Sequence, residues 1–306
     1  MDIKNTSGGV GHAIIASVLW GILPLYWNLI DHIPSTQILA HRIVWSLIFM
    51  SLLLLFNKRL PDLKKTVCNA IDIKFILMAS VFITANWGLY IWAVNNNRIL
   101  ETSLGYYILP LISIMFGMFF FKEKLDAYQK ISLIFAFVGV IILVAKYGTI
   151  PWVSLLLAIT FAFYSVLKKM IKIDSIIGLV LETGFIAPIA LIYIIANQLS
   201  GSGVLGHISI TQTLLLLGSG IATAGPLLFH SLATKKISLS TLGFTQYISP
   251  SLSLLIGIFV NHEPFTTTHL VSFCFVWCGL VIYSVSQLNS IKKKNSRQTS
   301  IYDSSL

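Results

Sequence analysis

The chain of 306 residues is 56% hydrophobic and 10% charged, whereas an ordinary soluble domain is roughly 45–50% apolar and about 25% charged. With a mean hydropathy of +0.84, this composition excludes a soluble globular protein and indicates an integral membrane protein. The formal net charge is +10, and a surplus of that size can indicate nucleic-acid binding. The positions of the basic residues, described below, argue against that interpretation.

Apolar runs of about 17 to 24 residues recur along the chain, and a helix needs roughly 20 residues to cross the hydrocarbon core of a bilayer. They predict an all-α protein with ten membrane-spanning helices, at residues 11–30, 38–56, 75–95, 101–121, 127–145, 151–167, 176–196, 211–233, 239–260 and 265–286. The first run contains Pro24 and is not followed by a small-residue cleavage pattern. We therefore expect it to be a retained helix and not a signal peptide.

The basic residues are distributed unevenly between the two sides of these spans. With a cytoplasmic N-terminus, Arg98 and Lys146 face outward and Arg42 lies inside a span, so 18 of the 21 lysines and arginines lie on the cytoplasmic side. Positive charge that flanks a span is retained in the cytoplasm during insertion. The pattern predicts that both termini are cytoplasmic, with affinity for anionic membrane lipid. No nucleic-acid partner is expected.

An internal repeat divides the chain into two halves. Residues 107–142 aligned with 247–282 are identical at 11 of 36 positions, and Pro110, Gly117 and Glu123 are among the matches. We call this register the repeat alignment. It predicts a five-helix repeat at 11–146 and a second at 147–287, with a cytoplasmic segment 1–10 and a basic, disordered tail 288–306. An odd number of helices in each repeat makes the second enter the membrane from the opposite side, as in many secondary transporters.

Three stretches carry a resemblance to the EamA branch of the drug/metabolite transporter superfamily: "LWGILPLYWNLIDHIPSTQILAHRIVWS", "ANWGLYIWAVNNNRILETSLGYYILPL" and "LGFTQYISPSLSLLIGIFVNHEP". The resemblance covers residues 8 to 288 in order and spacing. It implies ten helices in two EamA-type repeats, a location in a bacterial inner membrane, and export of small metabolites or drugs.

Two charged side chains lie inside predicted spans at positions that the repeat alignment makes equivalent. They are Arg42, which follows His41, and Glu182. An intramembrane charge usually faces a cavity or a partner, although Arg42 could instead extend its guanidinium to the outer surface. Burial favours a neutral carboxylate, so Glu182 is a candidate for proton coupling. The alternative is a structural carboxylate that caps a helix start and is bonded to Thr183 or to a neighbouring helix. The two charges lie toward opposite ends of the hydrocarbon core, so a direct ion pair between them is not expected.

The span 75–95 has a polar and aromatic face, which suits an aqueous cavity better than lipid. Polar residues also precede the equivalent prolines Pro110 and Pro250, where a bend would assist a conformational change, with ordinary kinked packing as the alternative. The candidate solute-binding residues are His41, Arg42, Asn86, Trp87, Tyr90, Tyr106, Tyr107, Glu182, Gln246 and Tyr247. Arg98 and Glu101 are expected to form a loop pair or to provide charge at a helix start.

Together these features predict a secondary transporter for a small molecule that works by alternating access. A Walker A lysine motif is absent from the sequence, which argues against an ATP-driven motor. We expect no catalytic residue, no cofactor and no metal, and a second copy of the chain is a candidate partner as a homodimer. A channel, or an intramembrane enzyme acting on a lipid-soluble substrate, is the alternative.

Overall fold

Ten helical segments in the described part of the chain are long and apolar enough to cross a membrane. The structure is a computed structural model, and it describes residues 3–67, 70–96, 98–148, 151–260 and 266–303. The elements are α1 Ile3–Trp27, η1 Asn28–Ile30, α2 Ser35–Phe56, α3 Leu60–Val67, α4 Ala70–Asn95, α5 Ile99–Phe121, α6 Ala127–Tyr147, α7 Trp152–Met170, α8 Ser175–Leu199, α9 Ile210–Thr234, α10 Leu239–Gln246, α11 Ile248–Phe259 and α12 Thr267–Asp303. The predicted all-α fold with ten spans is confirmed.

Among the differences from the sequence-based boundaries, three bear on the arrangement described below. The helix α7 continues to Met170, beyond the predicted end at residue 167. The ninth span is interrupted at Tyr247, which separates α10 from α11. Proline lacks a backbone N–H, so Pro250 leaves the carbonyl four residues earlier without its helical donor. The last helix continues to Asp303, through most of the tail that was expected to be disordered.

Side chains at helix starts explain where several helices begin. Asp126 and Gln129 form a capping box at the start of α6, and Ser209 and Gln212 form another at the start of α9. Asp174 accepts a hydrogen bond from the first turn of α8. Each cap provides an acceptor for backbone N–H groups that have no partner inside the helix.

The helix starts follow the same register as the sequence repeat. Under the repeat alignment, the first residue of each of four helices in the first half coincides with the first residue of a helix in the second half. The pairs of starting residues are Ser35 and Ser175, Ala70 and Ile210, Ile99 and Leu239, and Ala127 and Thr267. The register of the repeat therefore extends well beyond residues 107–142, where the sequence match was counted.

The equivalent helices α6 and α12 pack against each other through small residues at equivalent positions. A Cβ added to Gly139 would lie 2.8 Å from the carbonyl oxygen of Ser272, and one added to Gly279 would lie 2.8 Å from that of Ser132. Ser272 also donates a hydrogen bond of 2.6 Å to the Gly139 carbonyl. The contact of Gly139 with Ser272 thus has an equivalent in the contact of Gly279 with Ser132. The order of these residues makes α6 and α12 antiparallel, and the equivalence relates the two helices by a local two-fold axis.

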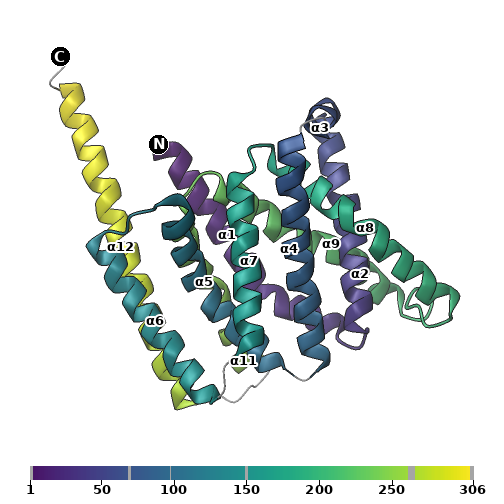
Figure 1. Ribbon diagram of the computed structural model, residues 1–306. Coiled ribbons are helices and arrows are strands. Elements are labelled where there is room, and N and C mark those ends of the chain that lie inside the picture. The colour runs from purple at the N-terminus through teal and green to yellow at the C-terminus, as the bar shows by residue number, and fades with distance from the viewer. Residues whose placement is uncertain (1–2, 68–69, 97, 149–150, 261–265, 304–306) are drawn as a thin grey trace.

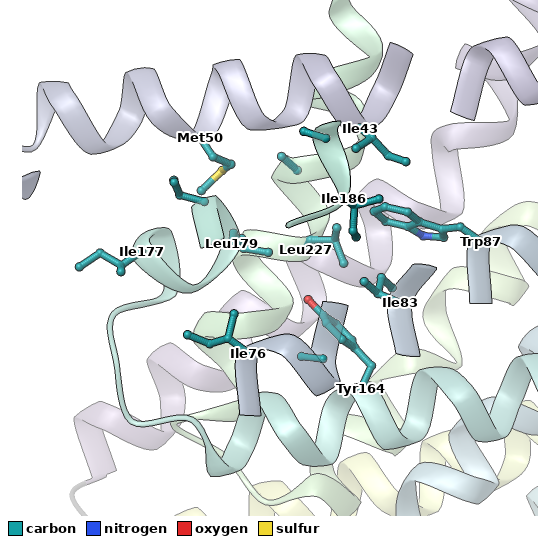
Figure 2. Close-up of a cluster of buried hydrophobic side chains, with 14 of the residues drawn as sticks. Ile43, Met50, Ile76, Ile83, Trp87, Tyr164, Ile177, Leu179, Ile186 and Leu227 are labelled. Atoms are coloured by element: carbon teal, nitrogen blue, oxygen red, sulfur yellow. The ribbon is translucent and has the colours of Figure 1, made fainter. Parts of the chain in front are cut away.

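Figure 1 shows the helices side by side, with α6 along α12, α7 near the centre, and both chain ends at the same end of the bundle. We call this end the terminal face, and the other end the opposite face. The chain starts at the terminal face, so every even-numbered span ends there. The helix α7 is the sixth span, so it ends at the terminal face, and α8 begins there. The largest cluster of buried apolar side chains joins α2, α4, α7, α8 and α9, and Figure 2 shows Trp87 and Tyr164 within it.

Candidate functional site

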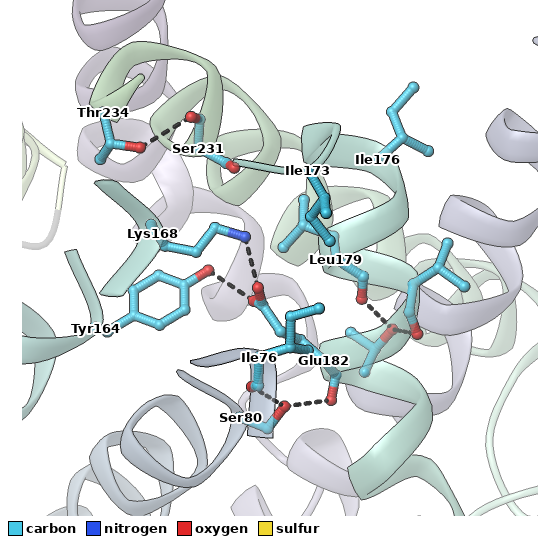
Figure 3. Close-up of polar contacts among 12 residues, drawn as sticks. Ile76, Ser80, Tyr164, Lys168, Ile173, Ile176, Leu179, Glu182, Ser231 and Thr234 are labelled. Carbon is cyan, nitrogen blue, oxygen red and sulfur yellow. Dashed lines mark hydrogen bonds and ion pairs between the residues drawn. The ribbon is translucent and has the colours of Figure 1, made fainter. Parts of the chain in front are cut away.

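Glu182 forms an ion pair inside the helical bundle near the terminal face. Its Oε1 atom lies 2.6 Å from Nζ of Lys168, and the side chains are 1% exposed for Lys168 and 3% for Glu182. The hydroxyl of Tyr164, one turn before Lys168 on α7, donates to Oε2 of Glu182 over 3.1 Å. Figure 3 shows both contacts converging on the carboxylate, with Ser80 of α4 donating to the Glu182 backbone carbonyl. Three helices therefore meet at this residue.

Lys168 was not predicted to lie inside the membrane. It was assigned to a cytoplasmic flank because the predicted span ended at residue 167, whereas α7 continues to Met170. Lys168, in the last turn of this helix, is buried beside Glu182, which supplies the opposite charge that a buried cation needs. The structural alternative holds in part, because the Glu182 carboxylate is bonded to the neighbouring helix α7. The cap at the start of α8 is Asp174 and not Glu182.

A buried histidine extends the polar groups around α7. Nε2 of His230, on α9, lies 3.0 Å from Oγ of Ser165. The His230 ring stacks on Tyr164 with 6.2 Å between ring centroids and also packs against Trp20 of α1. His230 was not among the predicted site residues, although a histidine inside an apolar run is a signal of the same kind as Glu182.

A second cluster surrounds Arg42, toward the opposite face. The guanidinium carbon of Arg42 lies 4.8 Å from the ring centroid of Trp87 and 5.4 Å from that of Trp27. Tyr90 and Tyr106 are close enough to interact electrostatically with the charge, and their rings are 6.4 Å apart. We call Arg42, Trp27, Trp87, Tyr90 and Tyr106 the arginine cluster. Three of the aromatic residues were predicted, and Trp27 was not.

Trp87 connects this cluster with Glu182. Besides packing on Arg42, it lines a small cavity together with Tyr164, Glu182, Ile83 and other apolar residues. The cavity has a volume of ≈ 10 Å³, which is room for about one water molecule. Trp87 is therefore next to Arg42 and lines a cavity with Glu182, and no ion pair joins the two charges among the described residues.

The residues before the two prolines are placed differently from one another. Tyr107 donates a hydrogen bond of 3.1 Å to the carbonyl of Pro250, which links the two proline-containing segments directly. Gln246 and Tyr247 are buried at the junction of α10 and α11. Within the described residues, the amide atoms of Gln246 and the hydroxyl of Tyr247 have no hydrogen-bond partner.

Two other predicted positions lie in helix contacts. The Asn86 amide donates to the Leu157 carbonyl over 2.8 Å and to Thr160 over 2.9 Å, which joins α4 to α7. His41 is buried on α2. Their roles in solute binding stay predictions.

Polar contacts tie the helix ends together at the terminal face. Glu123, after α5, accepts hydrogen bonds from the backbone N–H groups of Leu239 and Ser240 at the start of α10. Lys169 contacts Glu123 at 3.8 Å and donates to the backbone after α9. Lys235 donates to the backbone between α7 and α8. Burial and the nearby charge of Lys168 lower the pKa of Lys235 to about 8, although nearby carboxylates oppose the shift.

Comparison with known proteins places this arrangement in a family. The model of the EamA-like transporter family matches residues 7–145. The uncharacterized transporter YojE of Bacillus subtilis is 40% identical over 94% of this chain and 97% of its own length. The chain belongs to the EamA-like transporter family. The protein RarD of Escherichia coli is 38% identical over 92% of this chain and 96% of its own length, so the resemblance seen in the sequence is confirmed.

The fold is shared with a solved structure at lower sequence similarity. A crystal structure of a protein superposes with a TM-score of 0.70 over 90% of this chain and 97% of the other, at 16% identity. A more distant relative, 26% identical, is the chloramphenicol-sensitive protein RarD of Pseudomonas aeruginosa. This EamA-family protein is a multi-pass membrane transporter of a bacterial type with a small-molecule substrate, and it is not an enzyme.

Proposed function

We propose that the protein is a secondary transporter that exports a small metabolite or drug by alternating access between two inverted repeats, residues 11–146 and 147–287. The observation that carries this proposal is the reciprocal packing of α6 and α12, in which Gly139 meets Ser272 as Gly279 meets Ser132. Two halves related by a two-fold axis can exchange conformations, which opens a shared site alternately to each side.

The terminal face is cytoplasmic in this proposal, and the protein resides in a bacterial inner membrane. Both chain ends lie at that face, and the excess of lysine and arginine flanks the spans there. A reporter fused after residue 201 should report an outer location, and reporters at either terminus a cytoplasmic one. A cytoplasmic signal at residue 201 would contradict the orientation.

The described conformation suits a transporter that is closed at the terminal face. Lys168 joins α7 to α8, Glu123 joins the end of α5 to the start of α10, and Arg59 after α2 pairs with Asp174 before α8. A passage to the cytoplasm cannot open between these helices unless such contacts separate. The deepest of them is the Lys168–Glu182 pair, because its side chains are almost fully buried.

We place proton coupling at Glu182. A proton on this carboxylate removes the negative charge that Lys168 faces at 2.6 Å, so protonation weakens the contact between α7 and α8. A ligand shifts a two-state equilibrium only through its different affinities for the two states. Glu182 meets that condition if its ion pair is formed in one state and broken in the other.

The test begins with metabolite profiling of cells with and without the gene, which identifies the exported solute. The purified protein is then reconstituted in liposomes, and flux of that solute is followed with and without a pH gradient. We expect saturable counterflow that the gradient drives. Linear ion conductance would instead indicate a channel, and chemical turnover without flux an enzyme.

Glu182→Gln should retain counterflow and lose the response to the gradient, because the amide cannot exchange a proton. Glu101→Gln is the matched control, since Glu101 is also buried and paired with a basic residue, Arg98. A normal gradient response in the Glu182 variant would remove this residue from coupling and leave the transport proposal intact.

A further inference from the structure

Arg42 is an intramembrane cation for which the described part of the chain supplies no carboxylate. Its guanidinium lies between Trp87 and Trp27, and its Nε atom is buried without a hydrogen-bond partner. No ion pair to Arg42 occurs among the described residues. A charged group inside a membrane normally faces a partner or a cavity, so a partner from outside the chain is the missing component.

The same chain contains a completed version of this arrangement at Arg98. The Arg98 guanidinium carbon lies 5.7 Å from the ring centroid of Trp92 and 5.4 Å from that of Trp152. Its NH1 atom also donates to Oε1 of Glu101 over 2.9 Å. Both arginines thus lie close to two tryptophan rings, but of the two only Arg98 is paired with a carboxylate among the described residues.

The repeat indicates that the difference is built into the sequence. Arg42 corresponds to Glu182 under the repeat alignment, and Lys168, the partner of Glu182, corresponds to Asn28. An asparagine carries no charge, so the first half lacks an ionic partner at the position where the second half provides one. The positive charge of Arg42 therefore remains available for a ligand.

We infer that the arginine cluster binds the carboxylate of a solute that also carries a flat aromatic group. A guanidinium matches a carboxylate with two parallel hydrogen bonds, and the rings of Trp87, Tyr90 and Tyr106 provide surfaces on which an aromatic group can stack. Tyr106 is 47% exposed, so one member of the cluster reaches the outside of the helical bundle. This inference gives the substrate class of the transporter proposed above. It rests on the proposed export function only for the statement that the bound acid is carried out of the cell.

The ion pair at Glu182 further restricts the range of solutes that the site can bind. A zwitterionic solute would require a negative group for its ammonium, and the Glu182 carboxylate already accepts from Tyr164 and pairs with Lys168. The site therefore favours an acid without an amino group over an amino acid.

Binding is tested with the purified full-length protein in detergent by ligand-induced changes in Tm. The probes share a phenylpropyl skeleton and differ in charge: 3-phenylpropionate, 3-phenylpropionamide and 3-phenylpropylamine. Nonanoate has the same number of carbons as the phenyl acid but no ring, and serves as the probe for a lipid-like acid. A ligand that binds only the folded state raises Tm with its concentration.

The phenyl acid should raise the Tm of the wild type more than the amide, the amine or nonanoate. Arg42→Gln should raise its apparent Kd about tenfold or more, as expected for the loss of a charge-assisted hydrogen-bond pair. Arg42→Lys keeps the charge but not the planar fork, so it should bind with intermediate affinity. The control Arg98→Gln, which alters the other tryptophan-held arginine, should bind the acid as the wild type does.

Equal Tm shifts for the acid and the amide, or unchanged acid binding in Arg42→Gln, would overturn the inference. A larger shift with nonanoate would also overturn it, because it would assign the site to lipid-like acids. The assay requires no flux. Acid binding at Arg42 without solute movement in liposomes would therefore contradict the transport proposal alone, and flux with normal acid binding in Arg42→Gln would contradict the binding inference alone.

Discussion

The Lys168–Glu182 pair gives a quantitative prediction for stability. Both side chains are almost fully buried, and their charged atoms are 2.6 Å apart. Removing one member of a buried pair leaves the other charge without compensation, which typically costs about 3–5 kcal/mol, whereas replacing both members by uncharged groups is often nearly neutral. We expect Lys168→Met and Glu182→Gln each to lose stability in this range, and the double variant to recover most of the loss.

The two single variants should not be equivalent. In Lys168→Met the carboxylate keeps the hydrogen bond from Tyr164, which partly compensates the remaining charge. In Glu182→Gln the amide oxygen can still accept from Tyr164, but the Lys168 ammonium remains buried without an opposite charge. The larger loss should therefore occur in Glu182→Gln.

The measurement is reversible unfolding of the purified protein in mixed micelles with increasing SDS, followed by circular dichroism. Arg59→Gln is the control, because Arg59 and its partner Asp174 are 42% and 30% exposed, and an exposed pair contributes about 0–1 kcal/mol. The double-mutant cycle isolates the interaction energy. A double variant whose loss equals the sum of the single losses would refute the reasoning, because the two residues would then be energetically independent.

Three further predictions concern packing and pH. Gly220→Ala should destabilise the protein by about 1–3 kcal/mol, because the new Cβ would lie 2.3 Å from the Trp45 backbone. The control Gly225→Ala should not, because nothing lies within 4 Å of its Cβ. Equal losses of stability in the two variants would contradict the close approach at Gly220. Asn86→Leu loses both bonds to α7 and should cost about 0.6–2 kcal/mol in the same SDS assay, a cost that a structurally idle amide would not show. Folding lowers the pKa of Lys235 from 10.5 to about 8. Between about pH 8 and about pH 10.5 Lys235 is therefore protonated in the unfolded state and largely neutral in the folded state, so the free energy of unfolding should rise with pH over this range. Lys235→Gln should remove that part of the rise, and identical pH profiles for wild type and variant would contradict it.

The ten spans could be predicted because each is long and apolar enough to be identified from its own residues. The register of the repeat was equally accessible, since Pro110, Gly117 and Glu123 recur in the same order and spacing within apolar sequence. The structure extends that register to the first residues of four helix pairs. Information of this kind is local or strictly periodic, so the order of residues along the chain is sufficient to reveal it.

The partners of the intramembrane charges could not be predicted in the same way. Lys168 follows an apolar run and precedes Lys169 and Lys172, so its sequence context is that of an ordinary basic flank. Its burial depends on Glu182, which lies on another helix, and on the tertiary packing that brings α7 and α8 together. The pairing of Arg98 with Glu101 was within reach because the two lie at positions i and i+3 of one helix start.

The charges at the two equivalent positions also constrain how the proposed exchange of conformations can work. If the first repeat adopted the present conformation of the second, Arg42 would take the place of Glu182 and would face Asn28 where Glu182 now faces Lys168. No ion pair could form there. In the same exchange Glu182 would leave Lys168 and would meet Leu167 at the position where Arg42 now has Trp27.

The two end states therefore differ in charge pairing even though the two halves share one fold. In the present state Glu182 is compensated and Arg42 is not, so a carboxylate ligand lowers the free energy of this state. In the exchanged state the Glu182 carboxylate would lose its cation, and the proton of the proposed coupling would replace that missing positive charge. Under the two proposals, a fold that is symmetric in its helices and asymmetric in these two charges would favour the acid in one state and the proton in the other, and such a difference between the states is what coupling requires.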